Sequence, residues 1–385
     1  MQPKNPFKAS LGVNPPLLVG RDEAIQNFQY ALDDGPGAHE RISLVVGPRG
    51  IGKTVLLNRL EDVARENGWR VLSETATTGF SERLRKAIIQ QLSINRREIK
   101  GLQLSLHGFG LGVDWDTTSL ENSSYSLRSA LKDLFAFQRE QDRIAGQAPT
   151  GVLITLDEMH HQHSQEVIEF GATIQHLVRE DEEIAVAMAG IPSSIKPLLA
   201  SHDSSGNTNP VTFLRRAERL ELGRVSDADV KAALEEPLTT TPFEWEPDAL
   251  ELAVKACQGY PFMIQLVGLC CVRAIENNRI TYDAARKGID QARVKLGRLV
   301  HYPALEELSD VDRTFLLKMA QDDGPSNTSD IAQRMRRKAA YIGNYRRRLI
   351  DAEIIVEAGH GKVDFALPYL RDFLREHAAN LMSDY

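Results

Sequence analysis

GPRGIGKT, at residues 47–54, matches the pattern Gly-x-x-x-x-Gly-Lys-[Ser/Thr] of a phosphate-binding loop. The apolar run at 41–46 predicts a buried parallel strand before the loop, and the amphipathic pattern at about 53–67 predicts a helix after it. In that setting backbone N–H groups and the positive end of the helix dipole face phosphate oxygens. We therefore expect nucleotide contacts from Gly47, Pro48, Arg49, Gly50, Ile51, Gly52, Lys53, Thr54 and Val55.

Two carboxylates follow the most apolar strand pattern of the chain, which ends with LITL at 153–156. Ligands of parallel nucleotide-binding sheets bind at the carboxyl ends of the strands, so Asp157 and Glu158 are expected near the loop. Lys53 is expected to reach the β- and γ-phosphates of ATP, and Thr54 and Asp157 to hold Mg²⁺, with Asp157 acting through water. Glu158 is then the candidate catalytic residue that polarises the attacking water. The alternative is that both acids only cap the next helix.

The composition restricts the class of protein. The chain has 385 residues, 42% apolar and 26% charged, which excludes a disordered chain and a pure coiled coil and suits two or three domains. No apolar run approaches the roughly 18 residues that span a bilayer, and residues 1–14 lack an apolar signal core. We therefore expect no membrane contact and a cytoplasmic location. The chain has only three cysteines, Cys257, Cys270 and Cys271, which suits a reducing compartment, and the adjacent Cys270 and Cys271 are expected to be core thiols.

Three domains are predicted from the order of the patterns. Strands alternate with helices up to residue 223, which predicts an α/β core with a parallel sheet, interrupted by a β-hairpin at about 102–116. Residues 224–299 show helix after helix with no strand pattern, which predicts a helical lid. Residues 300–385 predict helices followed by a hairpin, the outline of a winged helix-turn-helix domain.

With these motifs in place, residues 15 to about 297 resemble AAA+ P-loop ATPases of the origin-recognition initiator and STAND-like group, which also often carry a winged helix. PPLLVGR at 15–21 resembles the element of that group that packs on adenine, which implies base contacts from Val19, Gly20 and Arg21. QGYPFMIQL at 258–266 resembles the Gly-x-Pro motif of STAND ATPases, which implies that Pro261 touches the base. The resemblance implies a fold of αβα core, helical lid and winged helix.

The resemblance also implies contacts between subunits. FLRRAERLEL at 213–222 resembles the segment in which the family carries arginine fingers, so Arg215 and Arg216 are candidate catalytic residues acting on a neighbouring subunit. The alternative is an ordinary solvated basic helix end. Two family features are missing: the strand at 184–189 ends without a polar sensor residue, and Phe262 stands where the initiator branch has a sensor arginine. These departures favour a slow switch, or one completed by a neighbouring subunit.

A basic segment lies in the predicted winged helix. Residues 334–348, RMRRKAAYIGNYRRR, hold seven basic residues and no acid, although the whole chain has a net charge of −7. The last helix of a winged helix enters the major groove of DNA. If Ile342 and Leu349 face inward, the expected contacts with double-stranded DNA are Asn344, Arg347 and Arg348, with Lys362 at the wing. The alternative is that this domain docks a protein.

These patterns together predict a switch protein that binds and hydrolyses ATP and couples its nucleotide state to DNA binding or to assembly on DNA. Self-assembly into a dimer, ring or filament, or contact with a partner protein, is part of that expectation. Two alternatives stay open. One is a STAND-like signalling or defence ATPase whose winged helix docks a protein partner. The other is a helper ATPase for transposition or replication loading.

Overall fold

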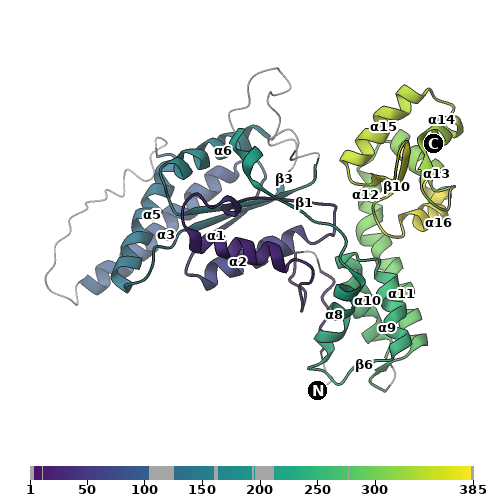
Figure 1. The fold of residues 1–385 in the computed structure, drawn as a ribbon, viewed down its shortest axis with the longest axis horizontal. Coiled ribbons are helices and arrows are strands. Elements are labelled where there is room, and N and C mark those ends of the chain that lie inside the picture. Colours follow the sequence, from purple (N-terminus) through teal and green to yellow (C-terminus); the bar gives the residue numbers. More distant parts are fainter. Residues whose placement is uncertain are drawn as a thin grey trace.

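The structure is a computed structural model, and it describes residues 4–10, 12–103, 125–159, 164–192, 195, 212–275 and 277–382. Three regions follow one another along the chain: an α/β core, a helical lid and a C-terminal region (Figure 1). The amino-terminal arm lies against the lid rather than against the sheet, and Asn5 Nδ2 donates a hydrogen bond to Leu269 O at 3.0 Å.

A five-stranded parallel sheet forms the centre of the core, in the order β2-β3-β4-β1-β5. Its strands are β1 (Ile42–Val46), β2 (Arg70–Thr75), β3 (Val152–Met159), β4 (Ile184–Gly190) and β5 (Glu218–Glu221). All seven residues of β4 are buried, as expected for a strand in a sheet that is covered on both faces. The parallel α/β core predicted from the sequence is therefore confirmed.

Helices cover both faces of this sheet (Figure 1). Alternate strand residues point to opposite faces, so Val45 and Leu153 belong to one apolar cluster, and Leu44 and Ile154 to the other. The first face is covered by α1 (Asp22–Asp34) and α2 (Lys53–Glu66). The second face is covered by α3 (Phe80–Gln103), α5 (Leu127–Ala145) and α6 (Ser164–Arg179). Two short 3₁₀ helices, His39–Arg41 and Thr212–Arg216, precede β1 and β5.

The hairpin predicted at 102–116 is corrected at its start. Residues 102 and 103 are helical and form the last residues of α3. The helix extends this far because the run from 94 to 100 is rich in Arg, Glu and Lys, which lose little freedom in a helix. The remainder of the predicted hairpin, 104–116, lies outside the described residues.

The lid consists of α8 (Asp227–Glu235), α9 (Pro247–Cys257), α10 (Pro261–Arg273) and α11 (Tyr282–Leu296), with a 3₁₀ turn at Glu236–Leu238. Contrary to the sequence prediction it also contains strands, β6 (Glu244–Trp245) and β7 (Arg279–Ile280), which pair in parallel. Two-residue strands are too short to show a period of two in sequence. All three cysteines are buried free thiols, which confirms the prediction made for Cys270 and Cys271.

The C-terminal region follows a π-helical turn (Gly297–His301) and α12 (Tyr302–Glu306). Its elements are α13 (Asp310–Met319), β8 (Ser326–Asn327), α14 (Thr328–Arg334), α15 (Ala339–Asp351), β9 (Ile355–Glu357), β10 (Lys362–Phe365) and α16 (Leu370–Met382). The strands form an antiparallel sheet in the order β8-β10-β9. Ile342 and Leu349 of α15 are fully buried, which confirms its predicted inward face.

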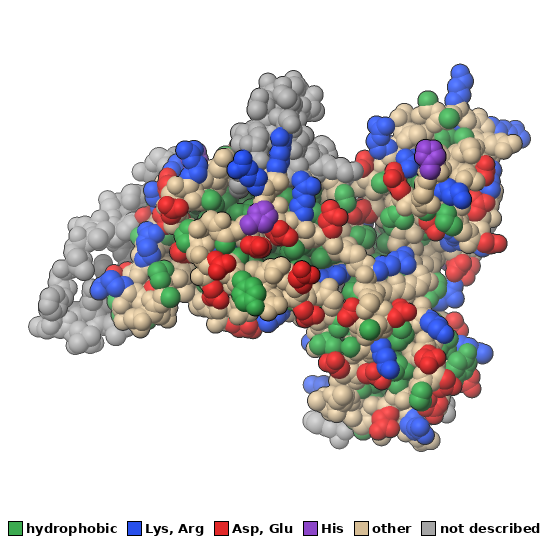
Figure 2. All heavy atoms as spheres, in the orientation of Figure 1, with side chains coloured by type: hydrophobic (Ala, Val, Ile, Leu, Met, Phe, Trp, Pro, Cys, Tyr) green, Lys and Arg blue, Asp and Glu red, His purple; other side chains and the backbone are tan. Residues whose placement is uncertain are grey.

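The surface carries charges of both signs. Figure 2 shows Lys and Arg side chains intermixed with Asp and Glu on the visible face of the C-terminal region. Within the ranges that the structure describes, no helix is both long enough and apolar enough to span a membrane.

Candidate functional site

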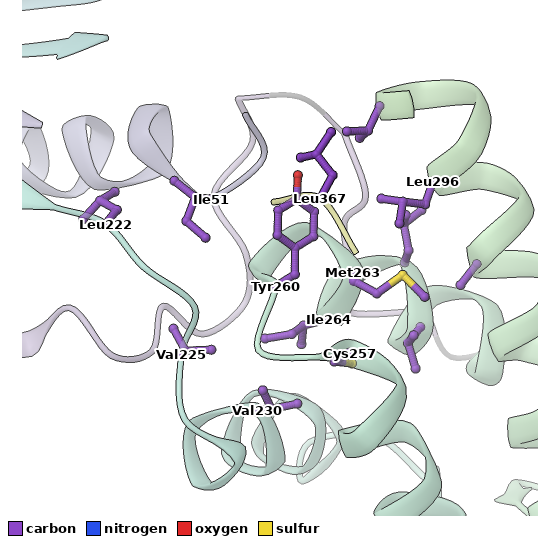
Figure 3. Close-up of a cluster of buried hydrophobic side chains, with 14 of the residues drawn as sticks. Ile51, Leu222, Val225, Val230, Cys257, Tyr260, Met263, Ile264, Leu296 and Leu367 are labelled. Atoms are coloured by element: carbon purple, nitrogen blue, oxygen red, sulfur yellow. The ribbon is translucent and has the colours of Figure 1, made fainter. Parts of the chain in front are cut away.

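The loop at 47–54 joins β1 to α2 in a conformation that depends on glycine. Gly50 and Gly52 have φ angles of +73° and +99°, in the left-handed region that other residues adopt at a cost. A Cβ atom at Gly50 would lie 2.1 Å from the hydroxyl oxygen of Tyr260, which belongs to the lid. That hydroxyl donates a hydrogen bond to Arg49 O at 2.5 Å. Figure 3 shows Tyr260 in a cluster of buried side chains that also includes Ile51 of the loop and Leu367 of the C-terminal region. The lid therefore contacts the loop directly.

The structure brings together the two motifs that the sequence separates by about a hundred residues. Thr54 Oγ1 donates a hydrogen bond to Asp157 Oδ2 at 2.6 Å, and Asp157 Oδ1 accepts one from Glu158 N at 2.8 Å. A hydroxyl and a carboxylate are hard oxygen donors of the kind that Mg²⁺ prefers. No group of three or more His, Cys, Asp or Glu side chains among the described residues forms a closed metal site. The donors present therefore fit an ion that keeps water and phosphate ligands.

Glu158 has an unusual backbone at the end of β3. Its φ angle is +54°, and the register between β3 and β4 shifts between Leu156 and Met159. A non-glycine residue in this region costs roughly 1–3 kcal/mol, and such strain concentrates at functional sites. The irregularity takes Glu158 out of the regular strand pairing and leaves it exposed at the carboxyl end of the sheet.

Lys53 is held by its own loop. Its Nζ donates hydrogen bonds to Gly47 O and to Pro48 O, the latter at 3.0 Å. Burial lowers the pKa of this ammonium group, and the nearby carboxylates, Glu353 first among them, oppose that shift. Two of its three N–H donors are therefore engaged within the loop, and Lys53 must leave these carbonyls to give more than one donor to a phosphate group.

Two acids from the C-terminal region face the cations of the loop, and no sequence motif marks either of them. Arg49 donates to both carboxylate oxygens of Glu307, at 3.1 and 2.6 Å. Glu353 follows α15 in a left-handed conformation (φ +58°) and is 9% exposed. Burial raises its pKa to about 7, against the opposing effect of Lys53 and Arg49. No described residue donates a hydrogen bond to its buried Oε2.

A cavity of about 170 Å³ adjoins the loop, between the core and the lid. Of the residues expected to contact the base, Val19, Arg21 and Pro261 line it, and Gly20 lies between the first two. Arg21 Nη2 donates a hydrogen bond to Gly223 O at 2.7 Å, at the junction of core and lid, and burial lowers its pKa. The sequence analysis assigned no contact to several further lining residues, among them Lys8, Ser10 and Gly12 of the amino-terminal arm and Gln265 of α10.

A larger cavity, of about 660 Å³, lies elsewhere on the core. It is lined by residues of α3, α5 and α6 and the segments before them, including Arg85, Tyr125 and Glu166. None of the loop or strand-end residues borders it, so it is separate from the candidate nucleotide site.

Arg215 and Arg216 lie on the 3₁₀ helix that leads into β5, and both are exposed. Neither lines the cavity beside the loop. The structure therefore does not bring them into the site of their own chain, and their action on a neighbouring subunit stays a prediction.

The basic segment is less positive than its sequence indicates. Three of its seven cations are paired with acids of the same region. Arg334 pairs with Asp322 at 2.5 Å, Arg346 pairs with Glu357 at 2.7 Å, and Arg348 pairs with Asp312. The candidate DNA contacts Asn344, Arg347, Arg348 and Lys362 are all exposed. Arg348 is engaged with Asp312, which reduces the positive charge that it offers to other groups.

Comparison with known proteins agrees with this geometry. Residues 17–186 match the AAA ATPase domain, and residues 298–374 match a domain of unknown function. No curated protein sequence matches the chain.

Solved structures are similar over nearly the whole chain. The Walker-type ATPase of Pyrococcus abyssi has a TM-score of 0.65 and 17% identity, over 93% of this chain and 96% of its own. RuvB of Thermotoga maritima, a Holliday junction branch migration motor, has a TM-score of 0.42 and 15% identity, over 92% and 95%. Cdc6p of Pyrobaculum aerophilum has a TM-score of 0.44 and 14% identity, over 98% of this chain and 97% of its own. From the family match and the first of these structures, the chain has the P-loop AAA+ fold, with an AAA ATPase domain at residues 17–186.

Proposed function

We propose that this chain is a slow ATPase switch, which binds Mg·ATP between the loop and the lid and transmits its nucleotide state to the C-terminal region. The observation that carries the proposal is the 2.6 Å hydrogen bond from Thr54 Oγ1 to Asp157 Oδ2, with Glu158 turned out of the strand beside it. This arrangement combines the oxygen donors for Mg²⁺ with a carboxylate for water.

Each residue of the site has a defined task in this proposal. Backbone N–H groups of the loop and the ammonium of Lys53 bind the phosphates, once Lys53 leaves the carbonyls of Gly47 and Pro48. Thr54 and Asp157 hold Mg²⁺, which when bound neutralises charge on the phosphates. Glu158 orients the attacking water and accepts its proton.

The base and the terminal phosphate are served by other elements. Val19, Arg21 and Pro261 enclose the base in the cavity that they line. Arg215 or Arg216 of a neighbouring copy adds positive charge at the γ-phosphate. Turnover is slow because β4 ends at Gly190 without a polar sensor and because Phe262 occupies the sensor position of the lid.

The C-terminal region is the proposed output. Its order α13-β8-α14-α15-β9-β10 is the order expected of a winged helix, and this supports the proposed contact with double-stranded DNA through Asn344, Arg347 and Lys362. Glu307 holds this region against Arg49, and Glu353 faces Lys53; both cations are ones that a bound phosphate would attract. Binding of a triphosphate therefore weakens the contact between the loop and the C-terminal region.

A second function is favoured by one observation. Three cations of the basic segment are already neutralised by acids, which suits docking of a protein partner better than binding of a polyanion. Duplex DNA binding that weakens steeply with salt supports the DNA function. Nucleotide-dependent assembly without any DNA affinity supports the signalling function.

The test of the ATPase itself is Glu158→Gln. An amide cannot accept a proton, so we expect phosphate release at saturating Mg·ATP to fall by about 10²–10⁴-fold while ATP affinity stays within about twofold. Glu169→Gln, an exposed position on α6, is the matched control and should leave turnover unchanged. Wild-type turnover in Glu158→Gln would remove this residue from its proposed task.

A further inference from the structure

A buried amide lines the cavity from the lid. Gln265 lies one turn after Pro261 on α10 and is 8% exposed. Its Oε1 accepts a hydrogen bond from the backbone N–H of Lys8 at 3.1 Å. A backbone N–H only donates, so this contact fixes which end of the amide faces the arm. The Nε2 end must face the other way.

That Nε2 end has two N–H donors, and no described residue accepts a hydrogen bond from it. Because Gln265 lines the cavity, these donors are available to an acceptor on a bound ligand. Lys8 and Arg21, which also line the cavity, likewise carry side chains that only donate. The cavity therefore suits the edge of a base that presents acceptors, and the ring nitrogens of a purine are such acceptors.

The orientation of Gln265 is fixed by a docked segment. Phe7 is 3% exposed and packs on α10 where a Cβ at Gly268 would lie 2.4 Å from its ring. Asn5 Nδ2 donates a hydrogen bond to Leu269 O at 3.0 Å, at the next residue of the same helix. Because these contacts lie outside the cavity, the arm stays in place whether or not the cavity holds a ligand. The amide of Gln265 is therefore preorganised for a ligand.

We propose that Gln265 determines the base specificity of the nucleotide site: its Nε2–H donates a hydrogen bond to a ring nitrogen of the purine of a nucleoside triphosphate. This inference rests on the proposed function of the site. It adds a residue that reads the base to the residues that bind the phosphates.

The test pairs substitutions at Gln265 with single-atom changes in the base. The full chain is titrated with Mg·ATP and with 1-deaza-, 3-deaza- and 7-deaza-ATP, each of which replaces one ring nitrogen by C–H. We expect one analogue to bind about 3–10-fold more weakly than ATP to the wild type, as for the loss of one hydrogen bond. In Gln265→Leu the same analogue should bind as well as ATP does.

Two further variants keep the test decisive. Gln265→Glu retains an acceptor for Lys8 N–H and removes the N–H donors, so it should also lose discrimination against that analogue even if Gln265→Leu detaches the arm. Asn5→Ala loosens the arm at a site outside the cavity and should keep the discrimination. ATP binding in which no analogue is penalised, or in which the penalty persists in both Gln265 variants, would overturn this proposal alone. Absence of any ATP binding by the wild type would overturn the proposed function with it.

Discussion

The loop at 47–54 and helix α15 both carry cations that interact with acidic side chains. The acids that face the loop belong to another region of the chain, whereas the acids that pair with α15 belong to its own region. Arg49 is paired with Glu307, 258 residues away in another region of the chain, and Glu353 of that region acts on Lys53. The acids that pair with Arg346 and Arg348, Glu357 and Asp312, belong to the same region as α15. An ion pair between two regions, such as that of Arg49 with Glu307, holds them together and can be displaced by a phosphate group that binds the same cation. Pairing within a region only fixes the local fold and lowers its positive charge.

The largest loss of ATP affinity is expected for a substitution of Lys53, the loop cation that is proposed to bind the phosphates. Lys53→Ala removes the two charge-assisted hydrogen bonds that this ammonium group is proposed to donate to phosphate oxygens. At about 2 kcal/mol each, their loss should lower ATP affinity roughly a thousandfold. Isothermal titration with Mg·ATP measures this loss. Arg59→Ala, on the same helix but paired with Glu66, should bind ATP normally. Retained affinity in Lys53→Ala would mean that nucleotide does not bind at this loop.

The buried carboxyl group of Glu353, which faces the loop from the C-terminal region, makes the stability of the fold depend on pH. Its folded pKa of about 7 exceeds the ordinary 4.5, so the folded state holds the proton more tightly and stability falls as the pH rises from 4.5 to 7. Lys53, Arg49 and Tyr260 are the charged and titratable groups that face it. Glu353→Gln should therefore gain about 3 kcal/mol at pH 8 over the wild type and show a flatter profile.

Urea unfolding at pH 5 and pH 8 checks this expectation. Glu306→Gln, an exposed neighbour on α12, serves as the control and should keep the wild-type dependence. The same pH slope in Glu353→Gln as in the wild type would show that this carboxyl is ionised without cost in the fold.

On α15 we expect Arg347 and Arg346 to contribute unequally to DNA affinity. Arg347 is exposed, whereas Arg346 is half-buried and paired with Glu357. If the region binds duplex DNA, Arg347→Ala should weaken binding about tenfold at low salt and reduce the salt slope by about one. Arg346→Ala should change DNA affinity less. Fluorescence anisotropy over a salt series measures both, with Lys287→Ala on α11 as the control, and equal losses in both variants would contradict the inequality.

The smallest effect is expected from the exposed pair of Arg49 and Glu307. Exposed ion pairs contribute up to about 1 kcal/mol, so Glu307→Gln should free Arg49 and raise ATP affinity by about two- to fivefold. Competition binding against a labelled nucleotide resolves such a change. Weaker ATP binding in this variant would indicate that Glu307 supports the site instead of competing with phosphate.

The parts that the sequence predicted well are those encoded locally. The strand, loop and helix around Lys53 depend on adjacent residues, and the approach of Asp157 to Thr54 follows from the shared edge of a parallel sheet. Val19, Arg21 and Pro261 line the cavity where the family resemblance implied. Their functional tasks remain predictions.

The parts that the sequence did not predict depend on contacts between distant segments. Glu353 lies in no motif, and the motif at 258–266 assigns a contact to Pro261 but none to Gln265. The positions of both side chains follow from how the C-terminal region and the arm pack on the core and the lid. The engagement of Arg348 by Asp312 likewise depends on the packing of α15 on α13, which helical periodicity does not specify. Burial and charge at such positions become visible only in three dimensions.

The left-handed backbone of Glu158 has a consequence for protein engineering. Glycine adopts that conformation freely and asparagine more easily than glutamate, so either replacement would relieve local strain. A library screened only for resistance to heat would therefore accumulate substitutions at this position. The most heat-resistant variants would then lack the Glu158 carboxylate that is proposed to orient the attacking water.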